Sequence, residues 1–298
     1  ALRDKGRAAD AADPTARVPH QLVMTATPIP RTLAMTAYAD LDISVIDELP
    51  PGRTPVQTVA IGSSRRTEVI ERIRVACAEG RQAYWVCTLI EENDEPPAPG
   101  APKIDAQAAQ TAYELLCEQL PQVRVGLIHG RMKPAEKQAT MAAFKRGEIQ
   151  LLVATTVIEV GVDVPNASLM LIENAERLGL AQLHQLRGRV GRGAAASSCV
   201  LMYQPPLSQT ARERLAVMRE TSDGFRIAEK DLELRGPGEL LGTRQTGLAG
   251  FRIADPVRDA DLLPQVQAAS DALLTQAPAL ADLLIERWIG QAVRYASA

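Results

Sequence analysis

The 298-residue sequence contains few aromatic residues, no long apolar run and few cysteines. Aromatic residues make up only 3% of the chain, which argues against binding of single-stranded nucleic acid by base stacking. No apolar run approaches the roughly 18 residues that a membrane-spanning helix needs, and the N-terminal segment lacks the apolar stretch of a signal peptide. We therefore expect a cytoplasmic protein with no membrane partner.

The four cysteines are Cys77, Cys87, Cys117 and Cys199. They fit neither a C-x-x-C metal pair nor a disulfide framework, and their neighbours are apolar. We expect them to be buried small apolar side chains, and we expect no metal site. The net charge of −3 provides no global positive field, so any binding to nucleic acid must come from local basic patches.

Apolar segments alternate with amphipathic segments between residues 56 and 204. The spacing predicts strands at 56–62, 82–90, 123–129, 149–155, 168–174 and 197–203, and helices at 64–80, around 106–119 and at 133–147. Strands that alternate with helices indicate βαβ units. We expect an α/β domain with a mostly parallel sheet that helices cover on both faces.

The segments on either side of this domain lack its regular alternation of strands and helices. Upstream, residues 21–26 and 43–49 are predicted short strands, and the Pro/Gly-rich stretch "PPGRTP" ends at residue 55 as a linker. Downstream of 204, two short helices that meet near Asp223 and Gly224 predict a helical hairpin, which a Gly-rich run and two more helices follow. We therefore divide the chain into residues 1–55, 56–204 and 205–298.

The stretch "QLRGRVGRG", residues 185–193, places three arginines within six positions. On an α-helix, Gln182, Gln185, Arg189 and Arg192 form one stripe, and Leu180, Leu183, Leu186 and Val190 form the opposite side. Gly188 and Gly191 are costly in a helix, so they suggest a site where a partner approaches closely. The pattern predicts a helix that offers guanidinium groups to an anion such as phosphate, and the alternative is a solvated basic face.

Two further stretches are predicted to follow strands directly. "LIHGR" ends with His129, Gly130 and Arg131, and "VATTVIEVGVDVP" carries Thr155 and Thr156, then Glu159, Gly161 and Asp163. Ligands of parallel α/β sheets bind at the carboxyl ends of the strands, and threonine hydroxyls and amides can hold a phosphate. We expect both stretches and the arginine helix at this edge, the alternative being loops without a function.

Together these stretches resemble the second motor domain of superfamily 2 helicases, in order and in spacing. "VATTVIEVGVDVP" resembles motif V and "QLRGRVGR" resembles motif VI, while "MTATPIPR" at residues 24–31 resembles motif III. Within the superfamily, residues 25–55 and "EKDLELRGPGELLGTRQTG" at 229–247 are similar to the RecG family of bacterial branched-DNA helicases. Mfd translocases resemble this chain in the same two stretches, but "VIDELPPGRTP" at residues 45–55 is similar to RecG rather than to Mfd. The resemblance extends from residue 20 to the end of the chain.

The resemblance implies a RecA-like fold and a role for each motif. Arg189 and Arg192 would reach the γ-phosphate of ATP, with Gln185 beside them. The remaining nucleotide residues would be Asp163, Gly161 and Glu159, and those for DNA contact and coupling would be Thr25, Thr27, Arg131, Thr155, Thr156, Arg235, Arg244 and Gln245.

The sequence lacks the G-x-x-x-x-G-K-S/T loop and the acidic pair that hold phosphates and Mg²⁺ in such motors. We therefore expect ATP and Mg²⁺ to be bound mainly by an upstream domain, and this fragment alone to be inactive. The implied partner is branched duplex DNA, and the implied oligomeric state is a monomer. Two alternatives are a non-catalytic RecA-like module that binds nucleic acid and an Mfd-like translocase that acts in transcription-coupled repair.

Overall fold

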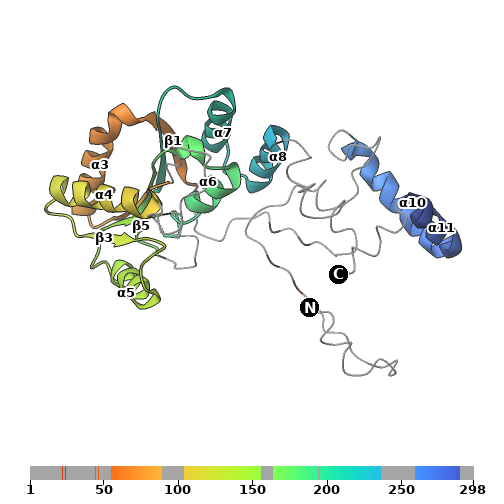
Figure 1. Ribbon diagram of the computed structural model, residues 1–298, viewed down its shortest axis with the longest axis horizontal. Helices are drawn as coiled ribbons and strands as arrows, with labels where there is room; N and C mark the ends of the chain where they lie inside the picture. The colour runs from red at the N-terminus through yellow and green to blue at the C-terminus, as the bar shows by residue number, and fades with distance from the viewer. Residues whose placement is uncertain are drawn as a thin grey trace, which may run out of the picture.

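The computed structural model describes residues 22, 24, 44, 46, 55–88, 104–155, 164–193, 195–235 and 259–288. Their centre is a six-stranded sheet with the order β1-β6-β5-β2-β4-β3, in which every neighbouring pair is parallel (Figure 1). The strands are β1 (Gln57–Gly62), β2 (Gln82–Val86), β3 (Val125–Ile128), β4 (Leu151–Ala154), β5 (Ala167–Ile172) and β6 (Ser198–Tyr203). The predicted parallel α/β domain is confirmed.

Helices connect these strands and continue beyond the sheet. The α-helices are α3 (Arg66–Ala78), α4 (Ile104–Gln119), α5 (Pro134–Lys145), α6 (Leu180–Arg187), α7 (Gln209–Glu220), α8 (Gly224–Arg235), α10 (Leu263–Gln276) and α11 (Pro278–Trp288). Short 3-10 helices are η1 (Ser63–Arg65), η3 (Ala175–Arg177) and η4 (Ala260–Leu262). The helices expected at 64–80, 106–119 and 133–147 are all present.

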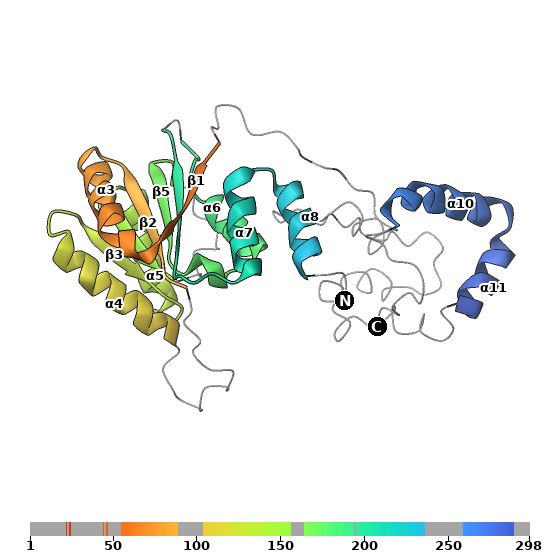
Figure 2. The same ribbon diagram turned by 90° about the horizontal axis from the view of Figure 1, so that it is seen from above.

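The sheet separates two apolar cores, because alternate residues of a strand point to opposite faces. Along β2, Tyr84 and Val86 pack into the core that α6, α7 and α8 share, whereas Ala83 and Trp85 pack beneath α3 and α4. Figure 2 shows α3 and α4 on one side of the sheet and α6, α7 and α8 on the other. All five residues of β2 are buried, as expected for a central parallel strand covered on both faces.

Glycine and proline end and start the helices that the sequence predicted. Gly80 has a φ of +83° and follows the C-cap of α3, and Gly147 has a φ of +76° and follows the C-cap of α5. This left-handed conformation favours glycine because other residues place Cβ too close to the backbone. Pro134 is the first residue of α5, where its missing N–H costs no helical hydrogen bond.

Helices α7 and α8 form the predicted hairpin. Ser208 caps α7 by accepting a hydrogen bond from the N–H of Ala211 at 3.2 Å. Asp223 accepts from the N–H of Phe225 at 2.8 Å and so begins α8. Both caps use short polar side chains that satisfy otherwise unpaired helix N–H groups. The hairpin packs on α6, so the segment after the sheet is tied to the arginine-bearing segment.

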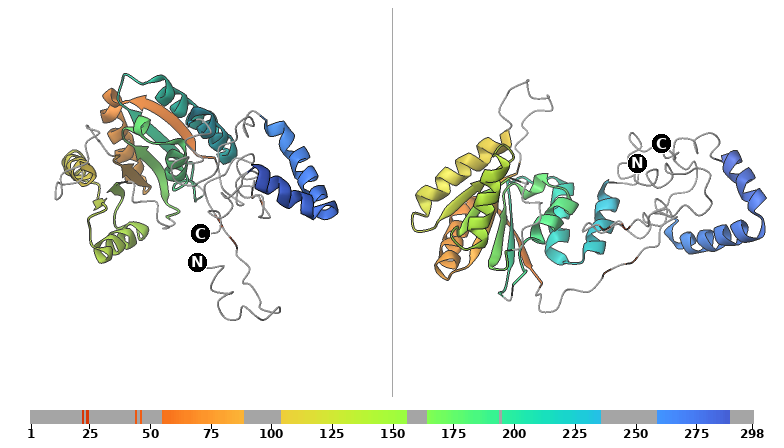
Figure 3. Two further views of the ribbon diagram at one scale, coloured as in Figure 1. Left: turned by 45° about the vertical axis from the view of Figure 1, so that its right-hand side comes forward. Right: turned by 90° about the horizontal axis from the view of Figure 1, so that it is seen from below.

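Helices α10 and α11 pack against each other and lie away from the sheet in all views (Figure 3). They keep large apolar side chains exposed, with Val266 at 59% and Leu283 at 62% of full exposure. The described residues therefore leave an apolar surface on this helix pair. Among the described helices none has both the length and the apolar composition that would let it span a membrane.

The short strands expected at 21–26 and 43–49 are wrong at the positions that can be checked. Leu22, Met24, Ser44 and Ile46 lie in no strand and are all exposed. An isolated extended segment cannot pair its backbone without a neighbouring strand, and no described strand lies next to these residues. The rest of both segments lies outside the described residues, and the three-part division of the chain stays a prediction.

Candidate functional site

The carboxyl edge of the sheet holds the described part of two predicted stretches. Thr155 follows β4 and is 3% exposed, and its N–H donates to the carbonyl of Ile128 at 3.2 Å. Its buried hydroxyl has no hydrogen-bond partner among the described residues. His129 and the exposed Arg131 follow β3 at the same edge. These residues lie where the parallel topology predicts, and Thr156, Glu159, Gly161 and Asp163 lie outside the described residues.

The predicted arginine helix is shorter than the sequence pattern suggested. Helix α6 ends at Arg187, Gly188 is its C-cap, and Arg189 and Arg192 lie beyond the last turn. The expectation of one helical stripe that carries both arginines is therefore wrong. The physical reason is the pair of glycines, since each glycine in a helix costs about 1 kcal/mol relative to alanine. We call residues 188–193 the arginine turn.

The arginine turn also lies at the opposite edge of the sheet from the one expected. A Cβ atom on Gly191 would lie 2.7 Å from Val56, which precedes β1, and one on Gly193 would lie 2.3 Å from the carbonyl oxygen of Pro165, which precedes β5. Both contacts are at the amino ends of strands. Helix α6 starts after the carboxyl end of β5 and runs back for about 12 Å, which carries the turn across the sheet.

These contacts also give the glycine at 191 a role within the chain. Its φ of +75° is left-handed, and the neighbouring Val56 leaves no room for a Cβ atom. The backbone conformation and Val56 therefore require this glycine by themselves, and the close approach of a ligand stays a prediction.

The predicted division of the segment into an apolar and a polar side is confirmed. The buried side chains are Leu180, Leu183, Leu186 and Val190. On the polar side, Gln185 and Arg189 are half-buried, and the exposed Arg192 donates from Nε to the carbonyl of Gly188 at 3.2 Å. Gln182 has a local role, since its side-chain oxygen accepts from the N–H of Gly179 at 3.2 Å and caps the start of α6.

Two arginines that the sequence analysis did not single out hold this region together. Arg187 is 4% exposed and donates to backbone carbonyls at the end of α7. Arg214 of α7 donates to the carbonyls of Leu178 at 2.7 Å and Glu176 at 3.0 Å, just before α6. No sequence signal distinguishes such arginines, because their carbonyl partners can belong to any residue type.

A cluster that the sequence pattern also did not predict lies at the carboxyl edge of the sheet, beside β2 and β5. Glu173, directly after β5, forms an ion pair with Arg66 of α3, whose guanidinium lies 5.0 Å from the ring centre of Trp85. The thiol of Cys87 lies 3.5 Å from the Glu173 carboxylate. Burial, with the nearby Glu173 charge, raises the pKa of Cys87, so this thiol stays protonated. The cluster joins α3 to the sheet and offers no thiolate nucleophile.

Cys77 and Cys199 agree with the prediction of buried side chains, whereas Cys117 is only half-buried. All four are free, and Cys77, Cys87 and Cys199 are buried. Burial raises the pKa of Cys77 to about 11 and that of Cys199 to about 12. In the described part of the chain, no group of three or more His, Cys, Asp or Glu side chains could hold a metal ion.

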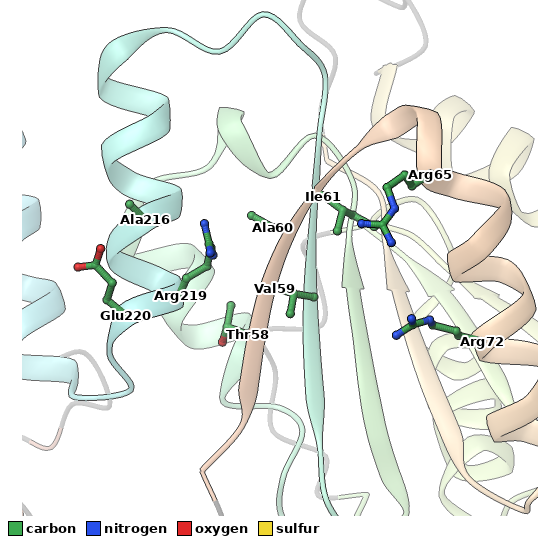
Figure 4. A pocket seen from close by; sticks show the side chains of 9 residues that line it. All are labelled: Thr58, Val59, Ala60, Ile61, Arg65, Arg72, Ala216, Arg219 and Glu220. Carbon is green, nitrogen blue, oxygen red and sulfur yellow. The ribbon is translucent and has the colours of Figure 1, made fainter.

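A groove of about 520 Å³ lies along the edge strand β1 (Figure 4). Strand β1 lies between Arg65 and Arg72 on the α3 side and Arg219 on the α7 side. Arg65 is held by Glu68 in an exposed ion pair at 2.7 Å. None of the residues predicted to contact nucleotide or DNA lines this groove.

The remaining predicted site residues lie beyond the described side chains. Arg235 is the last residue of α8, and its side chain lies outside the described part of the chain. Thr25, Thr27, Arg244 and Gln245 also lie outside it. Their roles stay predictions.

Two family profiles match the chain. The profile of the helicase conserved C-terminal domain matches residues 102–194, and that of "ATP-dependent DNA helicase RecG, domain 3, C-terminal" matches residues 221–284. The first covers the segment from α4 to the arginine turn. The second covers α8, α10 and the first part of α11.

Curated relatives and a solved structure extend this similarity to nearly the whole chain. ATP-dependent DNA helicase RecG of Escherichia coli K12 is 66% identical over 94% of this chain and 39% of its own length. RecG of Haemophilus influenzae is 58% identical over 100% of this chain and 41% of its own length. A structure of RecG bound to a three-way DNA junction has a TM-score of 0.65 and 46% identity, over 83% of this chain and 31% of that one.

The chain matches the C-terminal region of RecG and has the RecA-like fold of the helicase C-terminal domain. It spans about two fifths of the length of these two curated relatives. The resemblance that the sequence motifs indicated is therefore confirmed.

Proposed function

We propose that this chain is the C-terminal motor portion of an ATP-dependent translocase that remodels branched double-stranded DNA, such as stalled replication forks and Holliday junctions, in recombination and repair. The similarity to RecG supports the activity. The observation that carries the assignment to this chain is that Gly193 of the arginine turn contacts Pro165, the last residue of the motif V stretch. Two motifs that the resemblance assigns to the nucleotide thus meet at one edge of the sheet.

On the nucleotide side, Arg189 and Arg192 contact the γ-phosphate of ATP, and Gln185 lies beside them. Guanidinium groups in such positions stabilise the charge that develops in the transition state, and they contribute about 10³- to 10⁵-fold in rate. The other residues of this side are Glu159, Gly161 and Asp163. ATP and Mg²⁺ are held mainly by the part of the full-length protein that carries the phosphate-binding loop.

On the DNA side, Thr155, Thr156 and Arg131 contact the phosphate backbone from the carboxyl edge. Such contacts are independent of sequence and suit movement along a duplex. Thr25 and Thr27 couple the state of the nucleotide to the DNA contacts. Arg235 at the end of α8, with Arg244 and Gln245 later in the sequence, transmits closure of the motor domains to the duplex.

When the γ-phosphate leaves, Arg189 and Arg192 lose their anionic partner. The cleft between the two motor domains then opens, since a ligand shifts a conformational equilibrium only through its differential contacts with the two states. The motor acts as a monomer in the cytoplasm. A non-catalytic module has no need of two arginines at the contact with motif V, and the RecG matches favour this function over that of an Mfd-like translocase.

Steady-state ATP hydrolysis tests the proposal, measured for this 298-residue chain and for the full-length protein, each with and without forked duplex DNA at low salt. We expect no turnover by the chain alone and DNA-stimulated turnover by the full-length protein. Turnover by the chain alone would show that it holds a complete phosphate site. A full-length protein without ATPase activity would support the non-catalytic alternative.

A further inference from the structure

Arg187, the last residue of α6, is a buried cation, and its hydrogen-bond partners among the described residues are all uncharged. Its guanidinium donates from Nη1 to the carbonyls of Met218 at 3.0 Å and Thr221 at 2.8 Å, and more weakly to the Thr58 hydroxyl at 3.5 Å. Its Nη2 lies 3.1 Å from Nδ1 of His184, which must accept because arginine only donates. Burial lowers the pKa of Arg187, which is the sign of a desolvated charge.

The carbonyl partners explain why the charge is tolerated. Met218 lies in the last turn of α7, and Thr221 is the C-cap of that helix. The last carbonyls of a helix have no intrahelical donor and carry the negative end of the helix dipole. Arg187 therefore caps α7 from the side and replaces the ion pair that a buried cation otherwise needs. Nη1 donates to both carbonyls and Nη2 donates to His184, so the guanidinium uses two nitrogens where a lysine ammonium has only one.

The same side chain touches three elements at one point. Arg187 directly precedes the arginine turn. The backbone of the turn is hydrogen-bonded to α6, since the N–H of Arg189 donates to the carbonyl of Leu186 at 2.9 Å. Thr221 begins the connection between α7 and α8. Thr58 is the second residue of β1, and Figure 4 shows it on the part of β1 that faces α7.

We propose that Arg187 is the positioning residue that transmits movement of the arginine turn to the α7–α8 hairpin. This inference rests on the proposed function, because it assigns a mechanical partner to the turn that carries Arg189 and Arg192. When the turn moves relative to the nucleotide, Arg187 moves the C-terminal end of α7, and the connection at Thr221 carries that movement to α8. The residue contacts neither nucleotide nor DNA.

The test uses the full-length protein with Arg187→Met, which keeps the stem and removes the donors. Arg212→Met is the matched control, since Arg212 is an exposed arginine of α7, the helix that Arg187 caps. The measurements are the thermal midpoint, kcat and KM for ATP with duplex DNA, and the number of ATP molecules hydrolysed per base pair translocated. We expect Arg187→Met to change kcat less than threefold and to raise ATP consumption per base pair about tenfold, while the control changes neither.

ATP consumption per base pair that stays at the wild-type value would overturn the proposal, even if hydrolysis and translocation both slow down. Arg187 would then be a structural residue. If Arg187→Met does not fold, Arg187→Lys decides, because it keeps the charge but has one donor nitrogen in place of the guanidinium group. For that variant we expect a rise in ATP consumption of about threefold, and wild-type consumption would overturn the proposal. A wild-type protein without DNA-stimulated hydrolysis would instead contradict the proposed function.

Discussion

The two faces of the sheet differ in what their arginines bind. On the α3 face, Arg65 and Arg74 each form an ion pair with a glutamate three residues away in the sequence, and both pairs are exposed. Under α6 and α7, Arg187 and Arg214 donate to backbone carbonyls of other elements. Exposed ion pairs contribute little to stability, whereas a half-buried or buried arginine that joins two elements makes the position of one depend on the other.

The comparison indicates which face can transmit a change. On the α3 side, one arginine crosses to another element, since Arg66 pairs with Glu173 after β5. On the α6 side, Arg187 directly precedes the arginine turn, and Arg214 binds the segment before α6. A movement of that turn therefore reaches the hairpin through defined hydrogen bonds, while the α3 face remains a packing surface.

The largest effect is expected from Arg192→Ala in the full-length protein. Loss of the guanidinium removes the contact that we propose with the γ-phosphate, so DNA-stimulated ATP hydrolysis should fall about 10³-fold with little change in DNA affinity. Steady-state kinetics and binding to a labelled fork measure the two quantities.

The matched variant from the other face is Arg74→Ala, which removes the exposed pair with Glu71. It should hydrolyse ATP at the wild-type rate. Wild-type turnover by Arg192→Ala, or an equal loss in both variants, would remove the distinction between the faces.

An intermediate effect is expected from alanine at two left-handed glycines, one on each face. A Cβ atom at Gly80 would lie in open space, whereas one at Gly191 would lie 2.7 Å from Val56. In both variants the free energy of unfolding should fall by about 1–2 kcal/mol, because alanine disfavours the left-handed conformation. Gly191→Ala adds overpacking against a stiff β-branched side chain, so its free energy of unfolding should fall by a further ~1–3 kcal/mol.

Urea denaturation of both glycine variants measures this difference. Equal losses of stability would mean that Val56 yields without cost and that the arginine turn is less constrained than its contacts indicate.

The smallest effect concerns the thiols beneath the two faces. The pKa of Cys77 is about 11 and that of Cys199 about 12, both raised by burial from 9.0. Because the unfolded thiols ionise first, their contribution to stability is complete below pH 9 and is lost as the pH rises toward 11. We expect the urea midpoint to fall over this range, and to fall less in Cys77→Ala and Cys199→Ala.

Cys117→Ser is the control for this pH dependence, since Cys117 is only half-buried. Its midpoint should follow the wild-type curve. In the native protein a thiol reagent should modify Cys117 before the other three cysteines, and rapid modification of Cys77 or Cys199 would contradict the burial argument.

The sequence pattern predicted most elements of the fold correctly. Alternation of apolar strands with amphipathic helices was sufficient for β1 to β6, because strands and helices bury their side chains with different periods. Gly80, Pro134 and Gly147 marked helix ends through backbone conformations that they prefer in any context. The hairpin at Asp223 followed from the same local chemistry.

The site was predicted less well, because its geometry depends on more than local pattern. The spacing of Gln185, Arg189 and Arg192 matched a helix, yet α6 ends at Arg187. The two glycines suggest space for a ligand, whereas the structure assigns Gly191 to a left-handed turn beside Val56. Periodicity alone did not reveal that Gly188 would end the helix.

By itself the sequence determined the identity and order of the elements, the buried side of α6 and the resemblance to RecG, since these depend on residue type and spacing along the chain. The tertiary structure decided that the arginine turn lies at the amino edge of the sheet and that Arg187 and Arg214 bind α6 to α7. The direction in which a helix crosses a sheet, and the carbonyls that a buried arginine meets, depend on neighbours distant in sequence, and backbone carbonyls carry no signature of residue type.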